Sequence, residues 1–184
     1  MKQIKSIDVL NDKQIMRKLS IASLLLFVVF FALFGLLTFI TASGSIIFGQ
    51  GFTFSSLLLL LGIIVAHELI HGFFFKVFNP KGKVKFGFKN GMAYATSPHS
   101  FYPKIPFAII VLAPFIILNS VLLFAYLKGF LSPVSFMLMS AFHASSCAGD
   151  FYFAYLLSTM PKSVLVEDTP VGINFYTKEI QDGK

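Results

Sequence analysis

Four long apolar stretches, at about residues 20–41, 54–78, 105–127 and 133–160, alternate with shorter polar segments along the chain. A helix needs about 20 mostly apolar residues to cross a bilayer, and each stretch reaches that length. The first stretch exceeds the about 7–15 apolar residues of a secretory signal, so we expect it to remain as a helix. The pattern predicts an all-α membrane protein with four transmembrane helices.

The polar segment between the second and third stretches, residues 79–104, has a pattern of its own. Residues 83–96 read KVKFGFKNGMAYAT, with partial alternation on either side of Asn90-Gly91. Asn-Gly is a preferred two-residue hairpin turn, so we expect a short β-hairpin there; the alternative is a polar connector on the membrane surface. Residues 161–184 are expected to form a tail, and residues 1–184 a single integral membrane domain.

The composition supports a lipid environment and the charges indicate an orientation. The chain is 56% hydrophobic and 12% charged, against about a quarter charged in ordinary soluble domains. Of the 15 basic residues, only Lys128 falls outside the two tails and the 79–104 loop, when Lys76 is counted at the edge of that loop. This distribution predicts a multi-pass protein of the cell membrane with both termini and the hairpin in the cytoplasm. It also explains the net charge of +7 without nucleic acid as a partner.

Five ionisable residues lie inside the apolar stretches: His67, Glu68, His71, His143 and Asp150. A charged side chain at bilayer depth costs about 2.5–3.5 kcal/mol even on the lenient insertion scale. Such residues are candidates for function, provided that something compensates their charge.

His67-Glu68-Leu69-Ile70-His71 has the HExxH pattern. Positions i and i+4 lie on one face of a helix, so both imidazoles can point at one metal ion. In zinc peptidases with this spacing, the glutamate is the general base for the water that the metal activates. The alternative is a pair of histidines that hydrogen-bond between helices. Because catalytic zinc normally takes three protein ligands, a Zn²⁺ site needs one more.

Depth in the membrane selects Asp150 as the third ligand. Counted from the assumed cytoplasmic ends of the stretches, His71 lies about 10 Å deep, His67 about 16 Å and Asp150 about 15 Å. The alternative is a carboxyl group that is protonated or bonded near Ser145 and Ser146. A shared level favours one metal centre with His67, His71 and Asp150 as ligands and Glu68 as the catalytic residue.

Four further residues are candidates for substrate handling or gating. Pro114 lies about 13 Å deep, where a proline kink would open a gap for water or an extended substrate. Asn119 and His143 lie about 21 Å and 25 Å deep, where they can hydrogen-bond to each other. The alternative is His143 as a metal ligand, which is disfavoured because helical rise leaves about 10 Å between it and Asp150. His99 is expected at the interface or as a gate over the site. The single cysteine, Cys147, cannot form an internal disulfide and fits no cysteine-based metal motif.

The segment HELIHG, His67–Gly72, lies in an apolar stretch with an acidic residue in a later one. It resembles the intramembrane zinc metalloproteases of the site-2 protease type, and the layout is similar to the small membrane proteins named putative zincin peptidases. In the site-2 pattern the third ligand is an aspartate followed by glycine, whereas here Gly149 precedes Asp150. The resemblance implies a zinc metallopeptidase for membrane proteins or peptides.

The function that these patterns favour is hydrolysis of a peptide bond near the cytoplasmic membrane boundary, with the hairpin edge holding the substrate as an added strand. The alternative is a catalytically silent membrane protein that carries a structural metal and binds a partner. Glu68 favours the enzyme, because a structural metal site needs no general base. A di-iron oxidase would need more than four histidines, and paired broken helices typical of transporters are absent from the pattern.

Overall fold

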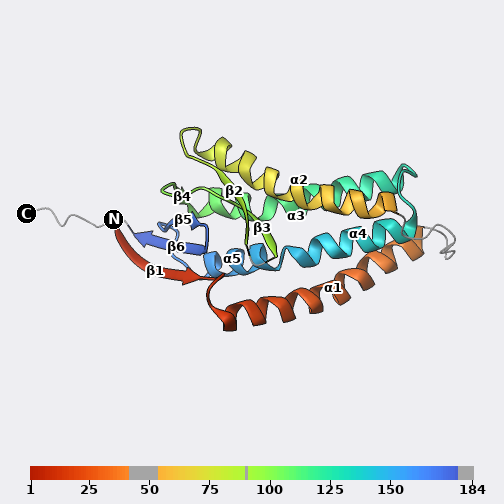
Figure 1. The fold of residues 1–184 in the computed structure, drawn as a ribbon, viewed down its shortest axis with the longest axis horizontal. Helices are drawn as coiled ribbons and strands as arrows, with labels where there is room; N and C mark the ends of the chain where they lie inside the picture. Colours follow the sequence, from red (N-terminus) through yellow and green to blue (C-terminus); the bar gives the residue numbers. More distant parts are fainter. Residues whose placement is uncertain (42–53, 90, 178–184) are drawn as a thin grey trace, which may run out of the picture. The chain divides into compact units, whose positions relative to one another are not determined.

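The computed structural model describes residues 1–41, 54–89 and 91–177. Within these residues the chain forms five helices and six strands (Figure 1). In order, the elements are β1 (Lys2–Asp8), α1 (Lys13–Thr41), α2 (Phe54–Phe78), β2 (Lys85–Lys89), β3 (Met92–Thr96), β4 (Phe101–Pro103), α3 (Lys104–Leu127), α4 (Pro133–Ser146), α5 (Ala148–Ser158), β5 (Leu165–Thr169) and β6 (Gly172–Thr177).

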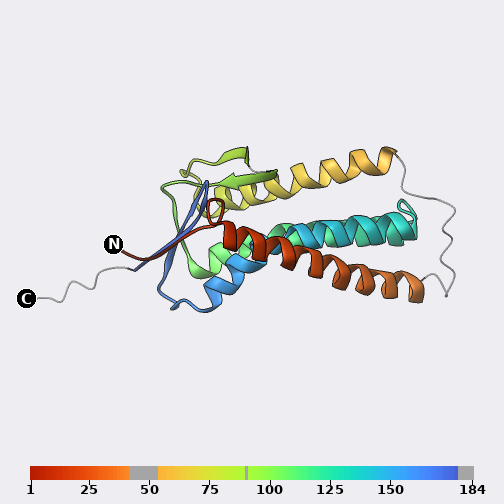
Figure 2. The ribbon, with the colours of Figure 1, turned by 60° about the horizontal axis from the view of Figure 1, so that its bottom comes forward.

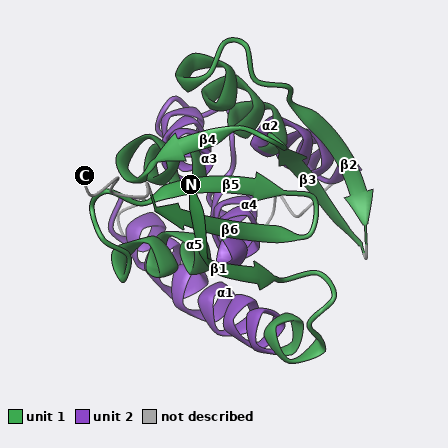
Figure 3. Ribbon diagram, turned by 90° about the vertical axis from the view of Figure 1, so that its left-hand side faces the viewer, with its two compact units in different colours: residues 1–17, 68–113, 150–184 green, residues 18–67, 114–149 purple. Residues whose placement is uncertain are grey.

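The chain divides into two compact units, which Figure 3 shows in different colours. Unit 1 consists of Met1–Arg17, Glu68–Ala113 and Asp150–Lys184, and unit 2 of Lys18–His67 and Pro114–Gly149. The division therefore crosses α2 directly after His67 and α3 directly before Pro114.

Three helices among the described residues, α1, α2 and α3, are long and apolar enough to cross a membrane. These agree with the first three predicted spans. The fourth predicted span is divided at Cys147 into α4 and α5, so the expectation of a single helix over residues 133–160 is wrong. Ser132 caps the start of α4 by accepting a hydrogen bond from Ser135 N at 3.2 Å. With 14 residues, α4 is about 21 Å long, which is shorter than the hydrocarbon core of a bilayer.

Unit 1 contains an antiparallel sheet in the order β1-β6-β5-β4, and Figure 3 shows its face. The expectation of an all-α fold is corrected here, because both predicted tails form strands of this sheet. In the C-terminal tail, the reason is the spacing of its apolar residues. Val166, Ile173 and Phe175 are fully buried and pack in one core with Tyr102 and Phe107. Burial of such side chains stabilises a fold by about 1.5–3 kcal/mol each.

The two edges of this sheet come from distant parts of the chain. Strand β1 pairs with β6, and Ser6 Oγ donates a hydrogen bond to Asn174 Oδ1 at 2.7 Å. Gly172 makes this pairing possible, because a Cβ at that position would collide with the carbonyl oxygen of Ile7. At the other edge, β4 follows the hairpin and pairs with β5.

The predicted hairpin is confirmed in unit 1. Strands β2 and β3 pair antiparallel, with Phe86 opposite Ala95 and Lys89 opposite Met92. Gly91 has a φ of 80°, in the left-handed region that a tight turn of this kind requires and that glycine adopts readily. Asn90, the other turn residue of the prediction, lies outside the described residues.

Unit 2 packs its helices around α4, which buries nine of its 14 residues. Figures 1 and 2 both show α1 running alongside α4. The Phe27 and Phe142 rings lie 4.9 Å apart between centroids, and the Phe34 and Phe136 rings lie 5.5 Å apart. Aromatic pairs at these distances stabilise a fold by about 0.5–1.5 kcal/mol each, beyond the free energy gained by burying their surface. The two contacts fix α1 against the helix that carries His143.

Candidate metal centre

Helix α2 carries the HExxH segment and continues for seven residues beyond it. His67 and His71 are both buried, at 9% and 7% exposure, and Glu68 between them is half-buried. Because α2 is continuous through this segment, the two imidazoles leave the same face on consecutive turns. The sequence-predicted arrangement of these three residues on one helix is therefore present.

His71 is held by a backbone carbonyl of α3, within unit 1. Its Nδ1 atom lies 2.9 Å from the Ile110 oxygen, and since a carbonyl can only accept, Nδ1 donates the hydrogen. The opposite nitrogen, Nε2, then keeps its lone pair. Metal-binding histidines are normally oriented by such a bond from their second nitrogen.

Pro114 explains why the Ile110 carbonyl is available to a histidine. In a regular helix, this carbonyl would accept a hydrogen bond from the backbone N–H of residue 114. Proline has no N–H, so the bond is missing inside α3. Ile110 is fully buried, and a buried carbonyl without a donor is costly. The His71 imidazole supplies the donor that Pro114 lacks.

Asp150 lies in the first turn of α5, in the same unit as His71. Its Oδ1 atom is 3.3 Å from His71 Nε2, at the long end for a direct hydrogen bond. Two ligands with zinc bonds of about 2.0–2.1 Å in a tetrahedron lie about 3.3–3.4 Å from each other. The observed separation therefore suits two atoms that bind one zinc ion, and the carboxylate and imidazole are donors that zinc accepts.

His67 is the last residue of the first segment of unit 2, where it meets His143 of α4. His67 Nδ1 lies 3.2 Å from His143 Nε2, and Cys147 Sγ lies 4.0 Å from the same His67 atom. A count of helical rise had placed His67 and His143 about 9 Å apart in depth, which is wrong. That count assumed one straight helix back from Met160, whereas the chain breaks at Cys147.

The predicted contact between Asn119 and His143 is present. Asn119 Nδ2 lies 3.0 Å from His143 Nδ1 and 2.8 Å from the carbonyl oxygen of Phe115, four residues earlier on α3. His143 is 2% exposed. The side chain that was considered for substrate handling is thus enclosed by unit 2, with partners on both ring nitrogens.

Gly72, the last residue of HELIHG, is where the hairpin meets α2 in unit 1. A Cβ at this position would lie 2.5 Å from Phe86 Cζ and 3.5 Å from Val84 Cγ1. Glycine therefore lets the hairpin approach the helix within one residue of His71. The hairpin packs on the helix that carries the motif.

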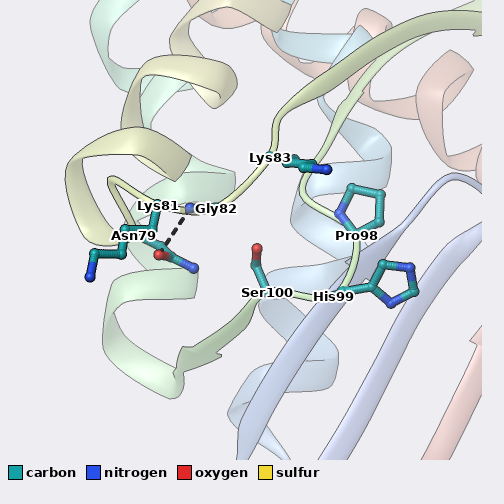
Figure 4. Close-up of a pocket in the computed structure, with 7 residues that line it drawn as sticks. All are labelled: Asn79, Lys81, Gly82, Lys83, Pro98, His99 and Ser100. Carbon is teal, nitrogen blue, oxygen red and sulfur yellow. Dashed lines mark hydrogen bonds between the residues drawn. The ribbon is translucent and has the colours of Figure 1, made fainter.

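His99 lies in a surface pocket of unit 1 and has a φ of 59°. Figure 4 shows this pocket, which has a volume of about 350 Å³ and is lined by Asn79, Lys81, Gly82, Lys83, Pro98, His99 and Ser100. The His99 imidazole is 96% exposed, and its backbone N–H donates to Glu167 Oε1 at 3.0 Å. His99 thus lies at the surface of unit 1, and its expected role at the membrane interface or as a gate over the site stays a prediction.

Asp168 of β5 is an acidic residue that the sequence reasoning left in the tail. It is 7% exposed, and burial raises its pKa to about 7. The charge of His71 lowers this pKa, and the charges of Asp150 and Glu68 raise it. A buried carboxyl group within the field of these residues belongs to the surroundings of the candidate site. Its neighbours Val164 and Val166 are apolar, and this apolar setting was the available signal.

The sequence reasoning also missed Cys147 as a possible metal ligand, although its spacing from His143 pointed to this role. It follows His143 by four residues, the same interval that separates His67 and His71. The hydrogen bond from His71 to the Ile110 carbonyl was missed as well, because it involves a backbone oxygen. The only sign of it in the sequence is Pro114, four residues later.

Comparison with known proteins points to the same chemistry. Residues 60–165 match the family model described as "Putative zincin peptidase". This range contains the HExxH segment, the hairpin, α3, α4 and Asp150. No curated protein and no solved structure matches the chain. Since the matched range covers more than half of its length, the chain belongs to the family described as "Putative zincin peptidase".

Proposed function

We propose that the chain is a membrane-embedded zinc metallopeptidase that hydrolyses a peptide bond near the cytoplasmic boundary of the cell membrane. The observation that carries this proposal is the setting of His71. One of its nitrogens donates to Ile110, while the other faces Asp150 at 3.3 Å, the separation of two zinc ligands. Family membership and the resemblance of HELIHG to site-2 proteases support the same chemistry.

The proposed ligands are His67 and His71 from consecutive turns of α2 and Asp150 from α5. Two imidazoles and a carboxylate leave one coordination position for water or substrate, as catalytic zinc requires. Zinc held there would supply the Lewis acid that activates water and polarises the peptide carbonyl. The Ile110 carbonyl keeps the His71 ring in the tautomer that binds metal.

Glu68 is the proposed general base and acid. It follows His67 directly on α2, and its charge acts on His71. Glu68 takes a proton from the attacking water and delivers it to the nitrogen of the scissile bond, so that the C–N bond breaks and the amine leaves neutral. Its partial exposure suits a group that must meet both water and substrate.

The sheet of unit 1 supports four membrane crossings. It joins β1, which precedes α1, with β4, which lies between α2 and α3, and with β5 and β6, which follow α5. Strands of one sheet must lie on the same side of a membrane. The chain must then cross twice between β1 and β4 and twice more before β5, and we assign the last crossing to α4 and α5 together. The distribution of lysines favours the cytoplasm for the sheet and both termini.

The proposed substrate is a membrane protein or peptide in extended form near the membrane surface. A helical peptide bond is shielded, so the substrate must give up helical hydrogen bonds before cleavage. Within the described part of the chain, β2 pairs with β3 alone, which leaves one edge of β2 for strand addition. The hairpin packs against α2 at Gly72, next to His71, so a strand added there would run close to the motif.

Zinc content and peptide hydrolysis, measured on the same purified samples, test the proposal. The wild-type chain and Glu68→Gln should each retain one zinc per chain, and only Glu68→Gln should lose hydrolysis of a reconstituted panel of single-span peptides. In a Cys147→Ser background, which removes the thiol close to His67, His71→Ala and Asp150→Ala should lose zinc, whereas His99→Ala, which removes an exposed histidine, should retain it. Zinc retained in Asp150→Ala in that background would refute the ligand set. Hydrolysis unaffected by Glu68→Gln would refute the catalytic role of Glu68, and bound zinc without hydrolysis by the wild-type chain would favour the silent metal protein.

A further inference from the structure

Unit 2 contains a second cluster of metal-ligand side chains, formed by His67, His143 and Cys147. The three residues are 9%, 2% and 0% exposed. Each offers one donor atom, and the three atoms lie within 4.8 Å of one another. We propose that this cluster is a binding site for a thiophilic metal ion of the Zn²⁺ or Cu⁺ class, separate from the Asp150 site.

The distances between the donor atoms support a metal site. In a tetrahedron with metal–nitrogen bonds of about 2.0–2.1 Å and metal–sulfur bonds of about 2.3 Å, two nitrogens lie about 3.3 Å apart and a nitrogen and a sulfur about 3.5 Å apart. The observed His67 Nδ1 to His143 Nε2 distance is 3.2 Å, and Cys147 Sγ lies 4.0 Å and 3.9 Å from these two nitrogens. Entry of an ion would require the sulfur to approach by about half an ångström.

The surroundings of the cluster hold its donors in place. His143 and Cys147 lie four residues apart at the end of α4, so both leave the same face of that helix. Asn119 contacts the second nitrogen of His143 at 3.0 Å, as orienting partners of metal-binding histidines do. The thiol contacts the His143 carbonyl oxygen at 3.3 Å. When an ion binds, the thiol proton passes to solvent, and the thiolate and two imidazole lone pairs form three bonds without a redox step.

Two imidazoles and one thiolate prefer a softer ion than two imidazoles and one carboxylate do. The two sites share His67, and a neutral imidazole has only one lone pair for a metal. An ion in the cysteine site therefore removes His67 from the Asp150 site. Excess thiophilic metal therefore inhibits the peptidase, a conclusion that rests on the proposed function.

Cadmium binding to the metal-stripped, detergent-purified chain tests the site, because a cadmium–thiolate bond absorbs in the ultraviolet. Cys147 is the only cysteine, so the absorption reports on this residue alone. The wild-type chain should show the band with one equivalent bound. Cys147→Ser should abolish the band, His143→Ala should weaken the cadmium affinity at least about tenfold, and Asp150→Asn should leave the band unchanged. Thermal unfolding of each variant checks that it is folded.

The outcomes separate this site from the proposed function. No band in the wild-type chain, or a band with unchanged affinity in folded His67→Ala and His143→Ala variants, overturns the cysteine site. Zinc retained in the double variant Cys147→Ser/Asp150→Asn, which lacks the thiol as well, refutes the catalytic ligand set, while a normal cadmium band in Asp150→Asn leaves the cysteine site standing. Excess zinc should inhibit hydrolysis by the wild-type enzyme and inhibit Cys147→Ser much less. Equal inhibition of both would overturn the regulatory role.

Discussion

The substitution Pro114→Ala isolates the role of a missing backbone hydrogen bond in metal binding. Alanine at position 114 restores an N–H that points at the Ile110 carbonyl, which now accepts from His71 Nδ1 at 2.9 Å. The new donor competes with the imidazole for the same oxygen. His71 would then be held less firmly in the tautomer and orientation that leave Nε2 for zinc.

The size of the effect follows from the geometry of the carbonyl. Loss of an orienting partner behind a metal-bound histidine lowers affinity about 10–100-fold. A carbonyl oxygen has two lone pairs, so the imidazole bond is weakened and not abolished. We therefore expect about a tenfold loss of zinc affinity, which corresponds to about 1.4 kcal/mol. The metal-free variant should be at least as stable as the wild-type chain, because alanine removes an interior proline from α3.

Zinc affinity is measured by competition with a chelator at fixed pH, and the stability of the metal-free chain by thermal unfolding in the same detergent. Pro106→Ala is the matched control, because Pro106 lies in the first turn of α3, where a backbone N–H has no intrahelical acceptor. It should leave zinc affinity unchanged. Unchanged affinity in Pro114→Ala would refute the link between the proline and His71, as would equal losses in both variants.

Three further predictions concern unit 1. Burial raises the pKa of Asp168 to about 7 from 3.8, so folding favours its protonated form: stability should fall by up to about 4 kcal/mol as pH rises from about 4 to 7. Thermal unfolding across this range should show the slope, and a slope that persists unchanged in Asp168→Asn would contradict the assignment. In Gly72→Ala, the added methyl group should push the Phe86 ring off α2, so Phe86→Ala should lower the unfolding temperature less in that background than in the wild-type chain; additive losses would rule out this contact. Proline at Phe86 or Phe88 of β2 should reduce peptide hydrolysis severely at full zinc content, more than alanine does, and full activity in both proline variants would exclude strand addition.

Local patterns in the sequence were sufficient for the elements that depend on near neighbours. Asn90-Gly91 and the alternation around it predicted the hairpin, and the spacing of His67 and His71 placed both on one face of α2. The apolar lengths identified α1, α2 and α3. Each of these inferences uses residues that lie in the same helix or in one hairpin. Within such an element, the regular backbone geometry fixes the directions of the side chains.

Features that depend on distant residues were not predictable in this way. The sheet joins strands from both ends of the chain, and nothing in β1 indicates that β6 will be its partner. The contact of His67 with His143 joins side chains of two helices that are 76 residues apart in the chain, and a count of helical rise did not predict it. The hydrogen bond between His71 and Ile110 involves a main-chain oxygen that no side-chain motif records. The sequence therefore predicted α2, which carries His67, Glu68 and His71, and missed both the separate helix α5 that carries Asp150 and the hydrogen bond that orients His71.

The pairing of β1 with β6 has a consequence for the biosynthesis of this protein. Ser6 and Asn174, which hydrogen-bond across these strands, are 168 residues apart in the chain. During translation, β1 is made before β6 and stays without this partner until α1 to α5, the helices described between the two strands, have been synthesised. Such long-range pairing is slow to form. The sheet of the unit that holds His71, Glu68 and Asp150 is thus completed only after the ribosome has synthesised α1, α2 and α3, the three helices that are long and apolar enough to cross a membrane.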